Sequence, residues 1–150
     1  MKTWVIAGIV AAFAYGLYSL PLKYLSSDKY MKAPLEVIAL GLALGVVVTG
    51  GVFAWIKGGH AVLAEPKLWP GLLIGAAAGA IWLIGTLTVT AAFRDPATNV
   101  AQLIPLVNAN TVVAVLGGLV VFRELANGAD LTRIAVGSAI IMIGSYILSA

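Results

Sequence analysis

Four amide side chains in one long apolar segment, residues 97–122, are the groups best suited to bind a substrate: Asn99, Gln102, Asn108 and Asn110. At about 100° per residue, Asn99, Gln102 and Asn110 fall on one quadrant of a helix, whereas Asn108 points elsewhere. Amides in an apolar medium are costly unless they are hydrogen-bonded or face a cavity. Two interpretations follow: the amides bond neighbouring helices, or they form the polar lining of a central cavity.

Pro105 lies inside the same segment and predicts a weak point in its helix. A proline in a helix interior removes one backbone hydrogen bond and leaves a carbonyl without its donor. If the amides line a cavity, Pro105 is the expected hinge beside it. If the amides instead bond neighbouring helices, each contact contributes about 1 kcal/mol. Chemical labelling from the aqueous phase separates the two cases, because residues that bond neighbouring helices are inaccessible to water and residues that line a cavity are accessible.

Aromatic and hydroxyl side chains in two other apolar segments could complete such a lining. Tyr15 and Tyr18 lie in the first segment, and Trp82 and Thr86 lie in the third. Aromatic walls with a few amide and hydroxyl groups suit a small polar solute without charge. The alternative is that these aromatic residues only pack between helices.

The composition places these residues in a membrane. The chain is 61% hydrophobic and 10% charged, against about 45–50% and 25% in ordinary soluble domains. A spanning helix needs roughly 20 mostly apolar residues. The runs of about that length are 3–20, 34–56, 70–93, 97–122 and 132–149. We therefore predict an all-α, polytopic membrane protein with a single five-helix transmembrane domain over residues 1–150.

Glycines at four-residue spacing predict where these helices approach one another. Gly41 and Gly45 share one face of the second segment, and Gly71, Gly75 and Gly79 share one face of the third. In lipid, small residues let helix backbones pack closely. The spacing indicates a compact bundle but no particular activity.

Several function classes find no support in the chain. There is no cysteine and one histidine, His60, so we expect no metal site and no cofactor. Ser138 and Ser145 lack a second histidine, a cysteine or a buried acid to activate them, so we do not expect an enzyme. The basic residues are scattered, which argues against nucleic acid as a partner. The acids nearest the spans, Glu36 and Glu124, lie close to the expected ends of spans, which argues against proton coupling.

The basic residues scarcely favour either orientation in the membrane. Five spans place the termini on opposite sides, and the nine basic residues then divide five against four. One side carries Lys2, Lys57, Lys67, Arg123 and Arg133, and the other carries Lys23, Lys29, Lys32 and Arg94. The positive-inside rule needs a larger bias to fix a topology. Either a weak single orientation or dual topology, with copies inserted both ways, fits this count.

The last third of the chain resembles one half of an EamA-type transporter. Residues 104–111 (IPLVNANT), continuing to 124, are similar to the fourth helix of that repeat, and residues 137–144 (GSAIIMIG) are similar to the fifth. Residues 15–23 (YGLYSLPLK) are similar to the first helix of the glucose/ribose porter branch. The family is the drug/metabolite transporter superfamily. The five-span layout matches throughout, and the motifs cover about half of the chain.

This resemblance implies a transporter built from two five-span halves in inverted orientation, with the substrate between them. The chain resembles one half, so a homodimer, probably antiparallel, is expected to complete the site and carry a small polar metabolite by alternating access. Membrane lipid is the other expected partner, and a prokaryotic cell (inner) membrane is the expected location. The first segment lacks the glutamate of the four-span multidrug relatives, which argues against proton-driven drug export. The alternatives are a non-transporting assembly partner and a lipid translocator.

Overall fold

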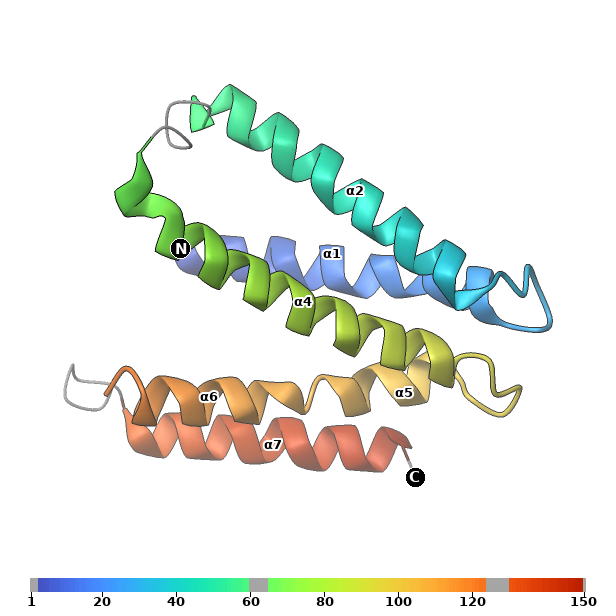
Figure 1. The fold of residues 1–150 in the computed structure, drawn as a ribbon. Helices are drawn as coiled ribbons and strands as arrows, with labels where there is room; N and C mark the ends of the chain where they lie inside the picture. Colours follow the sequence, from blue (N-terminus) through green and yellow to red (C-terminus); the bar gives the residue numbers. More distant parts are fainter. Residues whose placement is uncertain (1–2, 60–64, 124–129, 150) are drawn as a thin grey trace. The chain divides into compact units, whose positions relative to one another are not determined.

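The computed structural model describes residues 3–59, 65–123 and 130–149, apart from the side chain of Trp4, and its regular structure is helical (Figure 1). Five helical segments are long and apolar enough to cross a membrane, which confirms the predicted all-α, multi-pass fold. The elements are α1 (Thr3–Ser26), α2 (Leu35–Ile56), η1 (Pro66–Leu68), α4 (Trp69–Ala92), α5 (Val100–Val107), α6 (Asn110–Val120) and α7 (Leu131–Ser149).

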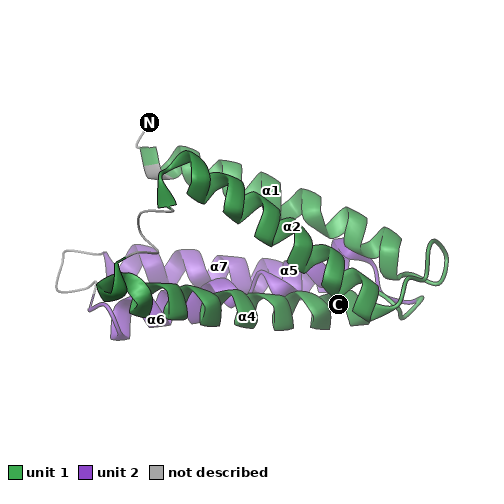
Figure 2. Cartoon of the chain, turned by 45° about the horizontal axis from the view of Figure 1, so that its top comes forward, with its two compact units in different colours: residues 1–96 green, residues 97–150 purple. Residues whose placement is uncertain are grey.

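The chain divides into two compact units, residues 1–96 and 97–150, coloured separately in Figure 2. The first unit contains α1, α2, η1 and α4. Its three long helices contact one another in pairs and come closest where α1 ends, α2 begins and α4 ends (Figure 1). The second unit contains α5, α6 and α7.

Helix α1 is longer than the sequence predicts, because it continues through Pro21 to Ser26 instead of ending near residue 20. Proline removes a single donor from a helix and need not end it when later turns are held by packing. The turn after Pro21 is held in this way: Leu22 is buried, and the Ser26 hydroxyl donates to the carbonyl oxygen of Leu22 at 2.8 Å. Lys23, expected in a connecting segment, therefore lies in the last turn of the helix.

The buried residues of the first unit gather at this shared end and include several hydroxyl side chains. Phe93 and Thr90 are fully buried. The Thr90 hydroxyl donates to the carbonyl oxygen of Thr86 at 2.7 Å, and the Ser19 hydroxyl donates to that of Gly16 at 2.7 Å. Each hydroxyl thus satisfies its hydrogen-bonding capacity on its own helix, so small polar residues can be packed between helices without a desolvation penalty.

In the second unit, α7 runs antiparallel beside α5 and α6 (Figure 1). The fourth predicted span, residues 97–122, corresponds to α5 and α6 together, a segment of 21 residues from Val100 to Val120. A turn at Asn108 and Ala109 separates the two helices.

The glycine faces of the first unit are open in the single chain. A Cβ atom added at Gly41, Gly45, Gly71, Gly75 or Gly79 would have no atom within 4 Å, apart from neighbouring residues and the helix's own backbone. The close helix contacts that the sequence predicts at these glycines are therefore not made by the described residues of this unit. Packing in the unit comes from the end that contains Phe93 and Thr90.

Candidate functional site

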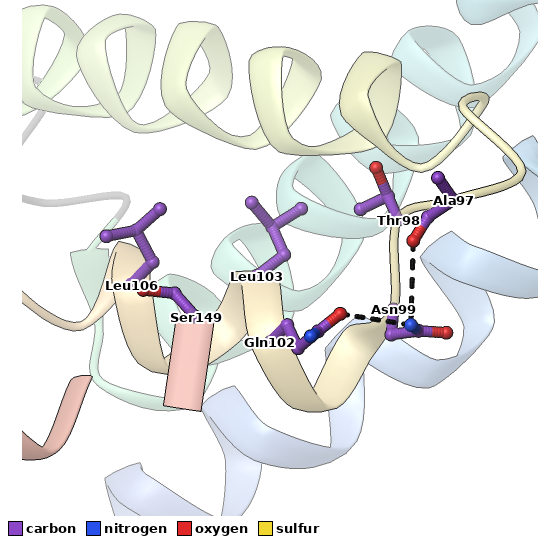
Figure 3. A pocket seen from close by; sticks show the side chains of 7 residues that line it. All are labelled: Ala97, Thr98, Asn99, Gln102, Leu103, Leu106 and Ser149. Carbon is purple, nitrogen blue, oxygen red and sulfur yellow. Dashed lines mark hydrogen bonds between the residues drawn. The ribbon is translucent and has the colours of Figure 1, made fainter. Parts of the chain in front are cut away.

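The amide side chains of Asn99 and Gln102 meet at the start of α5. Asn99 has an extended backbone (φ −101°, ψ 142°) and stands immediately before the first helical residue. Its Nδ2 donates to Oε1 of Gln102 at 3.0 Å and to the carbonyl oxygen of Ala97 at 3.5 Å (Figure 3). Both side chains are exposed. The structure therefore brings these two predicted site residues into contact.

This amide pair lines a pocket of about 240 Å³ in the second unit. The pocket is bounded by the start of α5 and by the last residue of α7 (Figure 3). Its lining residues are Ala97, Thr98, Asn99, Gln102, Leu103, Leu106 and Ser149. The amides and the hydroxyl groups can donate and accept hydrogen bonds but carry no charge. The lining is thus suited to a polar, uncharged molecule rather than to an ion.

A second feature of the same span is the turn between α5 and α6. The amide of Ala109 donates to Leu106 at 3.1 Å, and the amide of Thr111 donates to Asn108 at 3.1 Å, so each bond joins residues three apart. The Thr111 hydroxyl also donates to the carbonyl oxygen of Asn108 at 2.7 Å. Such a tightened turn in the middle of a helix is typical of a hinge or of a strained sequence.

Pro105 lies inside α5, and the interruption begins three residues later, at Asn108. Pro105 has no N–H to donate to the carbonyl oxygen of Ala101, so the helix is already weakened one turn before the break. Asn108 then favours a turn over a helix interior, because its side chain competes for backbone groups. The two residues together account for the position of the break.

The interruption changes the expected arrangement of the amides. The prediction that Asn99, Gln102 and Asn110 share one quadrant assumes a continuous helix. In the structure Asn99 precedes α5 and Asn110 is the first residue of α6. The periodicity of one helix does not carry across a turn, so Asn110 is not placed with the amide pair by helical phase. Asn108 lies in the break, Asn110 directly follows it, and both are exposed.

The other predicted site residues belong to the first unit and form two local pairs. The rings of Tyr15 and Tyr18 meet edge to face, with centroids 6.4 Å apart and planes at 76°. The Thr86 hydroxyl donates to the carbonyl oxygen of Trp82 at 2.9 Å. Thr86 is 3% exposed, whereas Trp82 is 37% exposed. Thr86 is therefore buried and bonded to its own helix. The two tyrosines and Trp82 are the more accessible of these groups.

Sequence reasoning missed Ser149, which lines the pocket from α7, because a serine at the end of an apolar segment carries no spacing signal. It also missed the two cations that join helix ends in the first unit. Lys23 Nζ donates to the carbonyl oxygen of Phe93 at 3.3 Å, and the Arg94 guanidinium donates to that of Ala33 at 3.0 Å.

Three residues singled out in the sequence complete the account. Glu36 is exposed in the first turn of α2, near the end of a span as expected. His60 and Glu124 lie outside the residues that the structure describes.

Comparison with protein-family models, with curated proteins and with solved structures gives no match to this chain. The resemblance to the drug/metabolite transporter superfamily therefore stays a prediction that rests on the sequence motifs.

Proposed function

We propose that this protein is a membrane transporter for a small polar, uncharged solute, which acts as a homodimer of antiparallel copies by alternating access. The observation that carries the proposal is the interruption of a membrane-spanning helix at Asn108 and Ala109, near the middle of Val100–Val120. Irregular backbone at membrane depth is tolerated where it is buried in protein or lines a water-filled cavity. Broken helices of this kind are typical of the substrate sites of secondary transporters.

The polar groups near the break support a solute site over a purely structural turn. Asn108 lies in the interruption and Asn110 follows it, and both are exposed in the chain. Asn99 and Gln102 hold each other at the start of α5. Each amide offers two N–H donors and one acceptor oxygen, which is the set needed to bind hydroxyl or carbonyl groups of a sugar-like metabolite.

The aromatic groups predicted to contact the solute belong to the first unit. Tyr15 is 63% exposed, so its ring is available to a solute or to a second copy of the chain. The homodimer is supported by the five-span layout and by the near-even division of basic residues between the two sides. A half-site of this kind needs a second, inverted copy to enclose a solute, as in other inverted-repeat transporters.

Flux measurements on purified protein in liposomes test the proposal. Wild-type protein should carry a polar metabolite from a panel of radiolabelled sugars and related solutes, and both Gln102→Ala and Asn110→Ala should slow uptake by about tenfold, the effect of losing one strong hydrogen bond in the transition state. Thr88→Ala is the matched control, because its exposed hydroxyl donates only to the carbonyl oxygen of Ile84 on the same helix.

Two results would contradict the proposal. Unchanged flux in both amide variants, with the fold intact, would show that Gln102 and Asn110 do not bind the solute. Co-purification with a stoichiometric second membrane protein, combined with no self-association and no flux, would instead identify the chain as an assembly partner.

A further inference from the structure

We propose that the first unit binds an anionic glycerophospholipid, with one acyl chain in a groove beside α2 and the phosphate at Arg94. The groove has a volume of about 420 Å³ and an apolar lining. Leu25 at the end of α1, Met31 and Ala33 in the following loop, and Val37, Gly41 and Leu42 on α2 form most of it. This site is separate from the amide pocket and does not depend on the proposed transport activity.

The groove begins at the level of a loop and continues into a membrane span. Ala33 precedes α2, and Leu42 lies in its second turn, roughly 10 Å further along the helix axis. An apolar channel that starts at the membrane interface and runs toward the bilayer centre has the direction of a lipid acyl chain. The shape therefore fits a lipid better than a compact water-soluble ligand.

The loop residues Met31 and Ala33, which form one wall of the groove, are fixed to α1 by backbone hydrogen bonds. The amide of Ala33 donates to the carbonyl oxygen of Leu25 at 2.7 Å, and the amide of Met31 donates to that of Tyr24 at 3.2 Å. The Tyr24 and Tyr30 rings also contact each other, with centroids 5.5 Å apart. The wall is thus preorganised, so a bound chain need not order it.

A cation stands at the mouth of the groove. The Arg94 guanidinium donates to the carbonyl oxygen of Ala33, itself a lining residue, at 3.0 Å. A guanidinium has five N–H donors in a fixed fork that matches phosphate geometry, and the side chain is exposed, so further donors can reach a headgroup. Lys29 is exposed on the loop that carries Met31 and adds a second positive charge.

The charges at this end sum to a small positive balance. Asp28 is paired with Lys32 at 3.1 Å, so that pair is neutral as a unit. Glu36 is exposed on α2, and Asp95 follows Arg94 in the chain. Four basic residues (Lys23, Lys29, Lys32 and Arg94) face three acidic ones (Asp28, Glu36 and Asp95) at this end, so the balance is positive. Basic pockets at the ends of membrane helices are typical sites for anionic lipid headgroups.

Native mass spectrometry of the full chain in detergent, with phosphatidylglycerol and phosphatidylcholine of the same acyl composition, tests the proposal. We expect wild-type protein to retain phosphatidylglycerol at least about tenfold more strongly, because the positive charge of choline opposes the cations at this end, whereas the glycerol headgroup is neutral. Arg94→Gln should abolish that preference, because glutamine carries no charge. Arg133→Gln is the matched control in the second unit, where Arg133 pairs with Asp130.

The groove itself is tested by filling it. Gly41 lines the groove and an added Cβ there has no contact within 4 Å, so Gly41→Leu should occupy the acyl site and weaken binding of both lipids about tenfold. Gly45→Leu, one turn further along α2, is equally open but does not line the groove, and should leave lipid binding unchanged.

Three results would overturn the proposal. Equal retention of the two lipids by the wild-type protein would contradict the preference for an anionic headgroup. Unchanged lipid binding in Gly41→Leu would remove the acyl site. Loss of self-association in Gly41→Leu without loss of lipid would show that a second copy of the chain covers the groove instead.

Discussion

The ammonium group of Lys23 joins two helix ends that are 70 residues apart in sequence, because it donates to the carbonyl oxygen of Phe93 at 3.3 Å. The same group lies 5.3 Å from the centroid of the Phe93 ring. The last carbonyls of a helix have no partner within the helix and carry the negative end of its dipole, so a cation placed there is favourable. Lys23 therefore links the end of α1 to the end of α4.

Replacing Lys23 with methionine should weaken this link while keeping the length of the side chain. We expect a loss of about 1–2 kcal/mol of stability, from one charge-assisted hydrogen bond and one cation–π contact. Chemical unfolding in detergent micelles measures the effect. Lys67→Met is the control, because Lys67 is 79% exposed beside Glu65, and it should change stability by no more than about 0.5 kcal/mol. Equal effects of the two substitutions would contradict the assignment.

Phe93→Ala should be far more destabilising than Thr90→Val, although both residues are fully buried. Truncating Phe93 leaves a cavity where three helices meet, which costs about 3 kcal/mol. Thr90 bonds the carbonyl of its own helix, so valine loses one local hydrogen bond and keeps the volume, at a cost below about 1 kcal/mol. The same unfolding experiment measures both. A loss of several kcal/mol in Thr90→Val would mean that its hydroxyl bonds another helix.

Pro105→Ala and Asn108→Ala should join α5 and α6 into one helix. Alanine at Pro105 restores a backbone donor, and alanine at Asn108 removes the competing side chain, so each favours the continuous form by about 0.5 kcal/mol or more. If the break is a hinge, both variants should lose transport and keep their fold.

Spin labels report the hinge directly, because the chain has no cysteine of its own. Labels at Ala101 and Val113, both exposed, should give a broad distance distribution in the wild-type background and a narrow one in Pro105→Ala. Identical distributions, together with unchanged flux, would show that the interruption is only structural.

Single cysteines at Lys29 and Lys67 should report the topology of the chain. Both residues are exposed, and they lie beyond opposite ends of α2. Dual topology predicts that a membrane-impermeant thiol reagent labels both positions from the same side, each at about half of the total. Labelling of Lys29→Cys from one side alone and of Lys67→Cys from the other alone would establish a single orientation.

The five spans could be predicted from the sequence because length and apolar content decide membrane insertion. The ends of the helices were less predictable. Hydropathy locates the point where charged residues begin, whereas a helix ends where its backbone hydrogen bonds stop. Lys23 and Ser26 fall outside the apolar run, yet α1 includes both because packing at Leu22 and the contact to Phe93 hold the last turn.

The contact between two of the candidate residues could be predicted from the sequence, whereas the break in the helix could not. The Asn99–Gln102 contact follows from three-residue spacing at a helix start. The break at Asn108 depends on the combination of Pro105, a turn-favouring amide and three-residue hydrogen bonds, which no single periodicity describes. A helical projection across that break consequently gives Asn110 a direction that the backbone does not keep.

Substitutions at the open glycines can show whether another molecule packs against them. These glycines are Gly41, Gly45, Gly71, Gly75 and Gly79. Judged by one chain alone, alanine fits at each of these positions and should be neutral or mildly stabilising, since it restricts the unfolded backbone. A glycine that nevertheless rejects alanine in a selection for expression in cells must be covered by something beyond the described chain. A scan of these five codons would thus map the hidden neighbours of the protein without any further structure.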